Sequence, residues 1–196
     1  MLRKGEQSRL VTLVPLWYRA PEVILRMPFN EEIDMWSLGV LAAELATGFP
    51  LYPGKKEYDV LRFIVKTQGQ PADHVLHRGM ASEVYLYRGP GNAQLCWIFK
   101  QTRDFTDEMG YYATETRHYQ LSDLDHFKPL MTVEGHPNDQ VLFMDLIKRL
   151  LHLDADPRIK PLEVLQHPFF LQSLPHSPTE QPSCSQTPGC IQHRKT

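Results

Sequence analysis

The most regular pattern in the chain is a run of apolar residues between Ile33 and Gly48. Apolar positions surround almost the whole circumference of a helix drawn through this run. The pattern therefore predicts a buried central helix of roughly four turns, rather than an amphipathic surface helix. Asn30 can cap its start, and Gly48 can end it in a left-handed turn. Glu44 interrupts the run, which is too short and too polar for a membrane-spanning helix.

Two further segments show the periodicity of amphipathic helices. Between residues 57 and 68, apolar side chains recur on one face, and Gly69 follows as a stop signal. A stripe of leucines predicts another helix over residues 141–153, capped by Asn138 or Asp139. Both helices should pack their apolar faces against the central one.

Residues 79–135 show no sustained periodicity, because Pro, Gly and polar residues interrupt every short pattern. The stretch nevertheless carries too many aromatic residues for a disordered linker. It is therefore predicted to be a packed, loop-rich insert. Short helices are predicted at residues 22–26, 72–78 and 121–127, and from Pro161 to a stop at Pro168.

Composition and charge restrict the class of protein. Of the 196 residues, 42% are hydrophobic, which is enough for one core and one domain. The formal net charge of −2 gives no electrostatic reason to expect binding to nucleic acid or to a membrane surface. Three cysteines do not make a disulfide framework, and the start of the chain has no apolar stretch of signal-peptide length. An intracellular, reducing location is expected.

The chain is expected to have three regions. Residues 1–11 are polar and basic and are predicted to be a flexible N-terminus. Residues 12–172 are predicted to form the folded domain. Residues 173–196 are rich in Pro and Ser and are predicted to be a disordered tail.

Asp34 is the unusual residue of the apolar run, because an ionised carboxylate is costly to bury without a partner. Two interpretations remain open. Asp34 can be a first-turn residue that reaches solvent near the positive end of the helix dipole. Alternatively, it can be a buried anchor that accepts backbone N–H groups from a neighbouring loop.

The resemblance to a known family rests on two motifs that lie close together. The first is Trp17-Tyr-Arg-Ala-Pro-Glu22, and the second is Asp34-Met-Trp-Ser-Leu-Gly39. Ala-Pro-Glu is a signature element of protein kinases. At this spacing, the two motifs resemble the end of a kinase activation segment leading into the central helix of the large lobe.

Residues 12–170 resemble the lower part of the large lobe of a protein kinase from the proline-directed and dual-specificity group. Within that group they are similar to the homeodomain-interacting protein kinases. That group also carries an insert between the second helix and the leucine-striped helix. The implied fold is mainly α, a partial kinase C-lobe with a loop-rich insert. Further matching stretches are Pro50–Gly54, Glu57–Asp59, Thr67–Pro71, Leu153–Asp156 and His167–Phe170.

The resemblance implies roles for individual residues. Glu22 is expected to pair with the distant Arg158, against the alternative of two surface charges that never meet. Asp34 is implied to anchor the backbone of the catalytic loop. A substrate-facing loop is implied at Leu16, Trp17, Tyr18 and Arg19. Structural roles are implied for Ala20, Pro21, Glu22, Asp34, Trp36, Gly39 and Arg158.

The catalytic elements of a kinase are not found in this chain. A kinase needs a Gly-rich loop, a strand lysine, an Asp base with an Asn magnesium ligand, and Asp-Phe-Gly, all before Ala-Pro-Glu in chain order. The twenty residues before Pro21 contain no Asp. His74 and His77 lie three positions apart, but no Cys or carboxylate joins them at ligand spacing. We therefore expect no catalytic residue, metal site or bound cofactor in this chain, although ATP and Mg²⁺ serve the complete family domain.

Departures from the family pattern affect the activation segment. Thr12 stands where the pattern has a phosphorylatable Tyr and is the candidate phosphorylation site. Pro15 and Leu16 stand where it has a hydroxyl residue followed by Arg, and neither can bond a catalytic Asp or a phosphate. Arg19 keeps the second basic position, so phosphate docking is expected to be weakened rather than lost.

Three hypotheses about function remain. The chain is a fragment of a serine/threonine kinase, inactive alone; or a pseudokinase-like module that sequesters substrates or partners of related kinases; or a helical protein unrelated to kinases. The expected partners are proteins, including a second copy bound through an uncovered lobe face, and not nucleic acid or membrane. Family resemblance implies a nuclear or cytoplasmic location.

Overall fold

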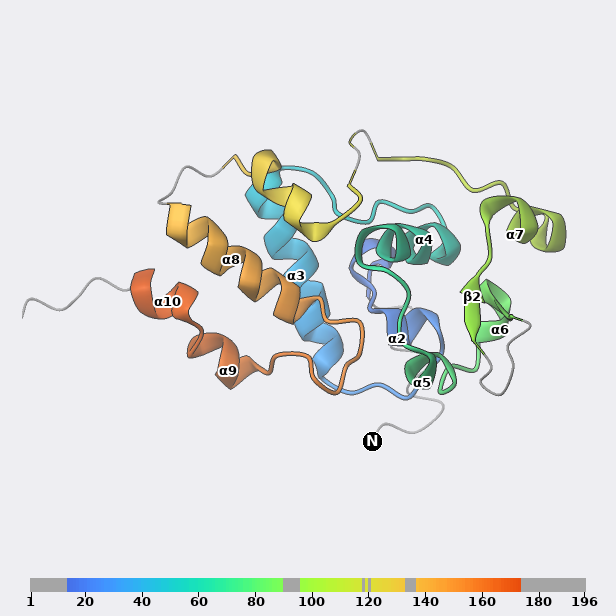
Figure 1. Cartoon of the computed structure of the whole chain (residues 1–196), viewed down its shortest axis with the longest axis horizontal. Coiled ribbons are helices and arrows are strands. Elements are labelled where there is room, and N and C mark those ends of the chain that lie inside the picture. The colour runs from blue at the N-terminus through green and yellow to red at the C-terminus, as the bar shows by residue number, and fades with distance from the viewer. Residues whose placement is uncertain (1–13, 90–95, 118, 120, 133–136, 174–196) are drawn as a thin grey trace, which may run out of the picture.

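The computed structural model describes residues 14–89, 96–117, 119, 121–132 and 137–173, and its fold is mainly α-helical, as predicted (Figure 1). The predicted flexible segment 1–11 and Thr12 lie outside the described residues, as does the predicted tail beyond Ser173. Within the described ranges, no helix is long and apolar enough to cross a membrane.

Helix α3 (Glu32–Thr47) is the predicted central helix. It ends as expected, because Gly48 adopts a left-handed conformation with φ 74° and donates its N–H to the carbonyl of Glu44 at 2.7 Å. Asn30 does not cap it: Glu31 occupies the N-cap position, without a side-chain hydrogen bond. The start of the helix is therefore stabilised by the acidic residues of its first turn, whose negative charge interacts favourably with the positive end of the helix dipole.

Helix α8 (Pro137–Leu150) lies alongside α3 (Figure 1). It begins and ends earlier than the predicted range 141–153, so Leu153 lies beyond the helix. The two helices approach closely at Gly39, where an added Cβ atom would lie 2.8 Å from Cβ of Leu150 and from Cδ2 of Leu151. Any larger residue at position 39 would push the helices apart, which accounts for its predicted structural role.

Periodicity predicted burial around almost the whole circumference of α3, but one face is exposed, which agrees with the uncovered lobe face expected from the resemblance. Leu38 and Leu41 are each 43% exposed and Leu45 is 71% exposed, although Trp36 on another face is fully buried. These leucines are spaced three and four positions apart, so they form a stripe along one side. We call Leu38, Leu41 and Leu45 the leucine face. Periodicity could not reveal it, because exposure depends on which other elements cover a helix.

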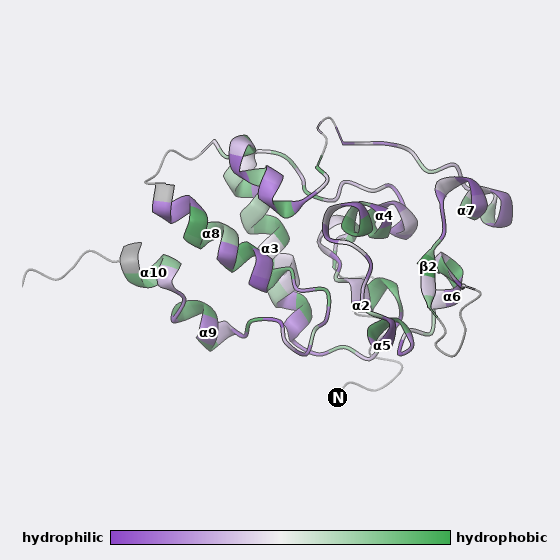
Figure 2. Ribbon diagram, viewed as in Figure 1, coloured by the Kyte–Doolittle hydropathy of each residue, from purple (hydrophilic) through white to green (hydrophobic). Residues whose placement is uncertain are grey.

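Helix α4 (Glu57–Gln68) has the predicted bounds, and Gly69 ends it with φ 82°. Three short elements lie around it: η1 (Leu16–Tyr18), α2 (Pro21–Ile24) and α5 (Asp73–Leu76). Helix α2 ends before the predicted Arg26, because that residue adopts a left-handed conformation with φ 55°. Both α4 and α8 carry hydrophobic and hydrophilic residues, as expected for amphipathic helices (Figure 2).

The insert is packed and loop-rich, as predicted. Its first part, up to Met109, lies on the far side of α4 from α3, whereas residues 124–130 pack against α8 (Figure 1). Its elements are α6 (Ser82–Tyr85), β1 (Leu86–Arg88), β2 (Trp97–Phe99), α7 (Thr102–Met109) and the 3₁₀ helix η2 (Leu124–Leu130). The antiparallel pairing of β1 with β2 was not predicted. Tyr58 of α4 stacks on Phe105 of α7 with ring centroids 3.9 Å apart, which joins the insert to the core.

The last helices are α9 (Pro161–Leu165) and α10 (Pro168–Ser173). Pro161 opens α9 as predicted. The prediction that Pro168 only ends this helix is wrong, because Pro168 begins α10, at a position where its missing N–H costs nothing. His167 between them is buried, with Nε2 2.9 Å from Oδ2 of Asp145 on α8.

Candidate functional site

The predicted substrate-facing loop, Leu16 to Arg19, is fixed to the rest of the fold. Leu16–Tyr18 form the 3₁₀ helix η1. Trp17 donates its indole N–H to the carbonyl of Gly54 at 2.9 Å, and the Tyr18 hydroxyl donates to Oε2 of Glu44 at 2.6 Å. That hydrogen bond, together with burial and the Glu44 charge, raises the pKa of Tyr18. The loop is thus held between α3 and the segment before α4.

Arg19, the basic position retained from the family pattern, is directed toward a carboxylate. Its Nη1 lies 2.7 Å from Oε1 of Glu57, and its Nη2 donates to the carbonyl of Val14 at 3.0 Å. Glu57 also accepts from Nη2 of Arg26 at 3.1 Å and from the hydroxyl of Tyr85 at 2.9 Å. Burial, with the Glu57 charge and hydrogen bond, raises the pKa of Tyr85. Sequence reasoning missed Glu57 as the centre of this network.

Glu22 and Arg158 meet, as expected from the resemblance. Nη1 and Nη2 of Arg158 lie 2.6 and 3.0 Å from the two carboxylate oxygens of Glu22. Arg158 also donates to the carbonyls of Glu32 at 2.8 Å and His152 at 3.1 Å. Its guanidinium lies 5.4 Å from the ring centroid of Trp36. Every nitrogen of this buried guanidinium therefore has a partner, which a buried charge requires.

The neighbouring structural residues support this pair by packing. Ala20 is buried in extended conformation, and Pro21 is the buried first residue of α2. Trp36 is fully buried and stacks on Tyr52 at 6.1 Å between ring centroids. The Ala-Pro-Glu element is consequently part of the core rather than a surface loop.

Asp34 is exposed, which favours the interpretation as a first-turn residue over that of a buried anchor. Across the described part of the chain, its carboxylate makes no hydrogen bond or ion pair. The anchoring role implied by the resemblance has no partner among these residues. Asp34 lies one turn before Leu38, so the carboxylate continues the leucine face toward the start of α3.

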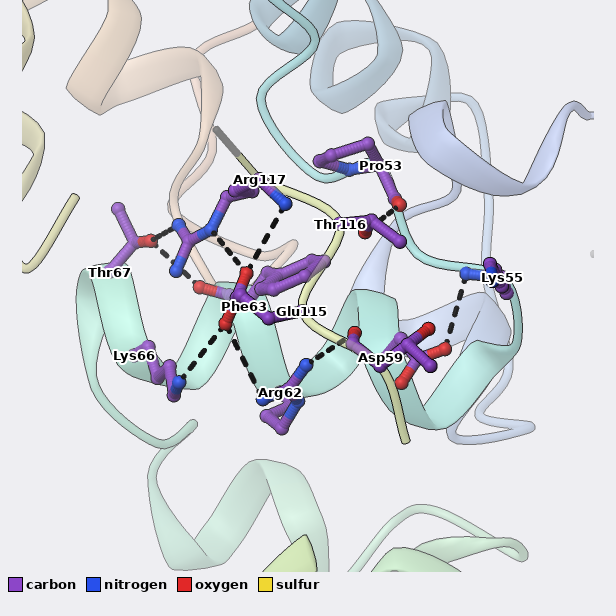
Figure 3. A network of polar contacts seen from close by, with 11 residues as sticks. Pro53, Lys55, Asp59, Arg62, Phe63, Lys66, Thr67, Glu115, Thr116 and Arg117 are labelled. Carbon is purple, nitrogen blue, oxygen red and sulfur yellow. Dashed lines mark hydrogen bonds and ion pairs between the residues drawn. The ribbon is translucent and has the colours of Figure 1, made fainter. Parts of the chain in front are cut away.

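A segment of the insert is bound along α4 by a network that the sequence did not reveal (Figure 3). The hydroxyl of Tyr111 donates to Oδ2 of the buried Asp59 at 2.6 Å. Glu115 lies between Arg62 at 3.6 Å and Lys66 at 3.5 Å, both on α4. We call residues 111–117 the strap.

Arg117 holds the other end of the strap. Its guanidinium lies 4.4 Å from the ring centroid of Phe63 and donates to Oγ1 of Thr67 at 3.3 Å (Figure 3). Burial lowers the pKa of Arg117. Thr116 donates to the carbonyl of Pro53. The strap thus connects the insert with α4 and with the segment before it.

A metal site is not found among the described residues. No group of three or more His, Cys, Asp or Glu side chains among them is arranged to hold a metal ion. His74 and His77 do not converge: His74 lies 3.0 Å from Asp154, and Nδ1 of His77 lies beside the carbonyl of Asp73.

Comparison with known proteins identifies the family. The protein kinase domain matches residues 3–170. Homeodomain-interacting protein kinase 2 of Mesocricetus auratus is 42% identical over 182 residues, which cover 87% of this chain and 16% of that protein. Homeodomain-interacting protein kinase 1 of Mus musculus is 40% identical, over 82% of this chain and 14% of that protein. Homeodomain-interacting protein kinase 4 of Homo sapiens is 38% identical, over 78% of this chain and 27% of that protein. The chain thus spans about a seventh to about a quarter of the length of these relatives.

Proposed function

The chain belongs to the protein kinase family, and we propose that it acts as the substrate-facing lower part of the large lobe of a serine/threonine kinase similar to the homeodomain-interacting protein kinases. In such a kinase, the γ-phosphate of ATP passes to a protein hydroxyl, and a Mg²⁺ ion neutralises the charge that develops. This chain contributes the loop that faces the substrate and the helices that hold the loop in place.

The observation that carries the proposal is the Glu22–Arg158 pair. Two nitrogens of Arg158 lie 2.6 and 3.0 Å from the carboxylate oxygens of Glu22, and this contact fixes the Ala-Pro-Glu element in the core. The Leu16–Arg19 loop directly precedes that element and is itself bonded to α3 and α4. A loop positioned by a rigid scaffold is the usual arrangement for protein segments that bind a partner.

The proposal includes inactivity of this chain by itself. Phosphoryl transfer depends on positioning and charge neutralisation by the phosphate-binding loop, the lysine, the metal ligands and the base. The sequence of this chain contains none of these motifs. The chain on its own is therefore expected to transfer no phosphate.

A chimera tests the proposal. The kinase domain of mouse homeodomain-interacting protein kinase 1 receives residues 14–170 of this chain in place of its corresponding segment. With Pro15→Ser and Leu16→Arg, the chimera is expected to phosphorylate a generic protein substrate, and adding Glu22→Gln is expected to reduce this activity. A folded chimera without activity would contradict the proposal, as would phosphate transfer by the unmodified chain alone.

A second candidate function is a binding module that sequesters partners of related kinases. The leucine face supports it, because exposed apolar stripes of this kind mark protein interaction sites. Beside that face, Ala42, Phe143 and Phe169 line an apolar pocket of about 330 Å³. Self-association of the chain through this surface belongs to the same proposal.

The proposed location is intracellular, nuclear or cytoplasmic, as in the family resemblance. Cys96, the free cysteine among the described residues, is exposed and suits a reducing compartment. Imaging of the tagged chain in cells tests the location. Secretion of the chain into the medium would contradict it.

A further inference from the structure

A cleft of about 510 Å³ opens between η1, the start of α4 and the insert. Among the described residues, its charged lining consists of four cationic side chains and one carboxylate. These are Arg19, Arg26, Lys55, Lys56 and Glu57. The charge of the cleft is therefore strongly positive, although the chain as a whole carries a formal net charge of −2.

The single carboxylate in the cleft neutralises only part of this charge. Glu57 is already shared between Arg19 at 2.7 Å and Arg26 at 3.1 Å. No described carboxylate lies within ion-pair distance of the exposed Lys55 or Lys56; Nζ of Lys56 lies 5.7 Å from the ring centroid of Tyr111. Two ammonium groups are thus free to bind carboxylates from another molecule.

Arg26 gives an independent indication that the cleft is functional. Its φ of 55° is the only positive φ of a non-glycine residue among the described residues. A left-handed conformation is strained for a residue with a Cβ atom, whereas glycine adopts it freely. The side chain of Arg26 is 38% exposed and lines the cleft. Backbone strain of this kind concentrates at functional sites.

The remaining wall of the cleft is apolar and aromatic. Leu16, Tyr58, Phe105 and Met109 contribute to it. An occupant therefore needs carboxylates at the cationic side and at least one large apolar side chain beside them. A peptide segment with aromatic and acidic residues has this chemistry, whereas a simple anion would leave the apolar wall unoccupied.

The ends of this chain do not have the required charge. Residues 1–13 contain Arg3, Lys4 and Arg9 against Glu6 alone. Residues 174–196 contain a single acidic residue, Glu180. Both segments are basic overall, so the positive cleft disfavours them as occupants.

We propose that this cleft binds an acidic peptide segment of a partner protein, with its carboxylates at Arg26, Lys55 and Lys56 and an aromatic or aliphatic side chain against the apolar wall. The inference rests on the proposed function, because Leu16 and Arg19 belong to the substrate-facing loop. It adds the chemical class of the partner.

The test uses the full chain and a fluorescein-labelled peptide that alternates Glu and Asp with Phe and Leu. Fluorescence anisotropy compares it with a neutral peptide in which Gln and Asn replace the acidic residues. The acidic peptide is expected to bind at least about tenfold more tightly, and to weaken as salt is raised, because charge pairs are screened. Each cation removed is expected to reduce affinity by about fivefold, since exposed charge pairs have this scale.

Arg26→Gly is the most informative variant, because glycine relieves the backbone strain while it removes the charge. The protein is expected to stay folded with an unchanged or higher thermal midpoint, and to bind the acidic peptide more weakly. Lys55→Gln with Lys56→Gln should weaken binding further. Lys148→Gln on α8, which removes a cation remote from the cleft lining, is the matched control and should have no effect.

Equal binding of the neutral and acidic peptides would overturn the inference, as would unchanged affinity in folded Arg26→Gly and in the double lysine variant. Equal competition by a single-stranded DNA oligonucleotide of the same charge would also overturn it, since the cleft would then be a general anion site. These outcomes are separate from the proposed function, which depends on phosphate transfer by the chimera.

Discussion

Arg158 and Glu22 lie 136 positions apart and form a buried, bidentate ion pair. Their side chains are 0% and 3% exposed. Because both groups have been removed from water, losing either partner leaves an uncompensated buried charge. The pair thus joins the segment before α9 to the Ala-Pro-Glu element and makes the position of the Leu16–Arg19 loop depend on the C-terminal part of the domain.

Removal of Arg158 should destabilise the chain strongly. Arg158→Ala is expected to lower the free energy of unfolding by about 3–5 kcal/mol, measured by urea denaturation. Arg103→Ala on α7 is the matched control, because Arg103 is exposed and should change stability by less than about 0.5 kcal/mol. Equal small effects of the two changes would reduce the ion pair to a surface contact.

The same substitution, Asp to Asn, should leave stability unchanged at position 34 and lower it at position 59. Asp34→Asn is expected to be neutral within about 0.5 kcal/mol, because the carboxylate is exposed. Asp59→Asn is expected to cost about 1–3 kcal/mol, because Asp59 is buried and accepts from Lys55 N, Lys56 N and the Tyr111 hydroxyl. Thermal unfolding of both variants measures the difference. A loss of several kcal/mol in Asp34→Asn would mean that another part of the chain binds this carboxylate.

The Tyr111–Asp59 contact should make stability fall at alkaline pH. Burial, then the hydrogen bond and charge of Asp59, raise the pKa of Tyr111 to about 12. The unfolded chain, with a tyrosine pKa of about 10, loses this proton first. The contribution of Tyr111 is therefore fully present below about pH 10 and is lost as pH rises toward about 12.

Tyr111→Phe should accordingly show a smaller loss of stability between pH 9 and about 11.5 than the unchanged chain. Urea denaturation at several pH values measures this. Tyr112→Phe is the matched control, because Tyr112 is 79% exposed and should leave the pH profile unchanged. Identical profiles for all three proteins would contradict the role of the Tyr111 hydroxyl.

The isolated chain should not bind nucleotide. Isothermal titration with ATP and Mg²⁺ is expected to give no saturable heat, because the described residues hold no cluster fit for a metal ion and the sequence lacks the phosphate-binding motifs. A complete kinase domain of the family serves as the positive control. Micromolar, saturable binding to protein free of contaminating kinase would disprove this prediction.

The leucine face should promote association between copies of the chain. Leu41→Gln combined with Leu45→Gln is expected to lower the apparent mass in sedimentation equilibrium, with little change in stability, because both side chains are already exposed. Leu162→Gln is the control, since Leu162 is 75% exposed but lies on α9, outside that face. If the unchanged chain is monomeric at all concentrations, self-association is wrong.

Sequence by itself determined the elements whose pattern is local. The bounds of α4 and the left-handed end of α3 at Gly48 followed from periodicity and helix-stop residues over a few turns. The motif pair around Glu22 and Asp34 gave the family, because two short motifs at a fixed spacing are improbable by chance. These features depend on neighbouring residues, so they can be read along the chain.

Tertiary structure decided the features that depend on distant contacts. The strap binds α4 through Arg62 and Glu115, which are 53 positions apart, and no local period marks this pairing. The leucine face is exposed because of what lies around α3, although its residues look like core residues in sequence. Arg26 adopts a left-handed conformation that local propensity disfavours. At Arg26, the free energy of packing the whole domain outweighs a local preference. In all three cases the outcome depends on residues distant in sequence, so it cannot be calculated from neighbouring residues alone.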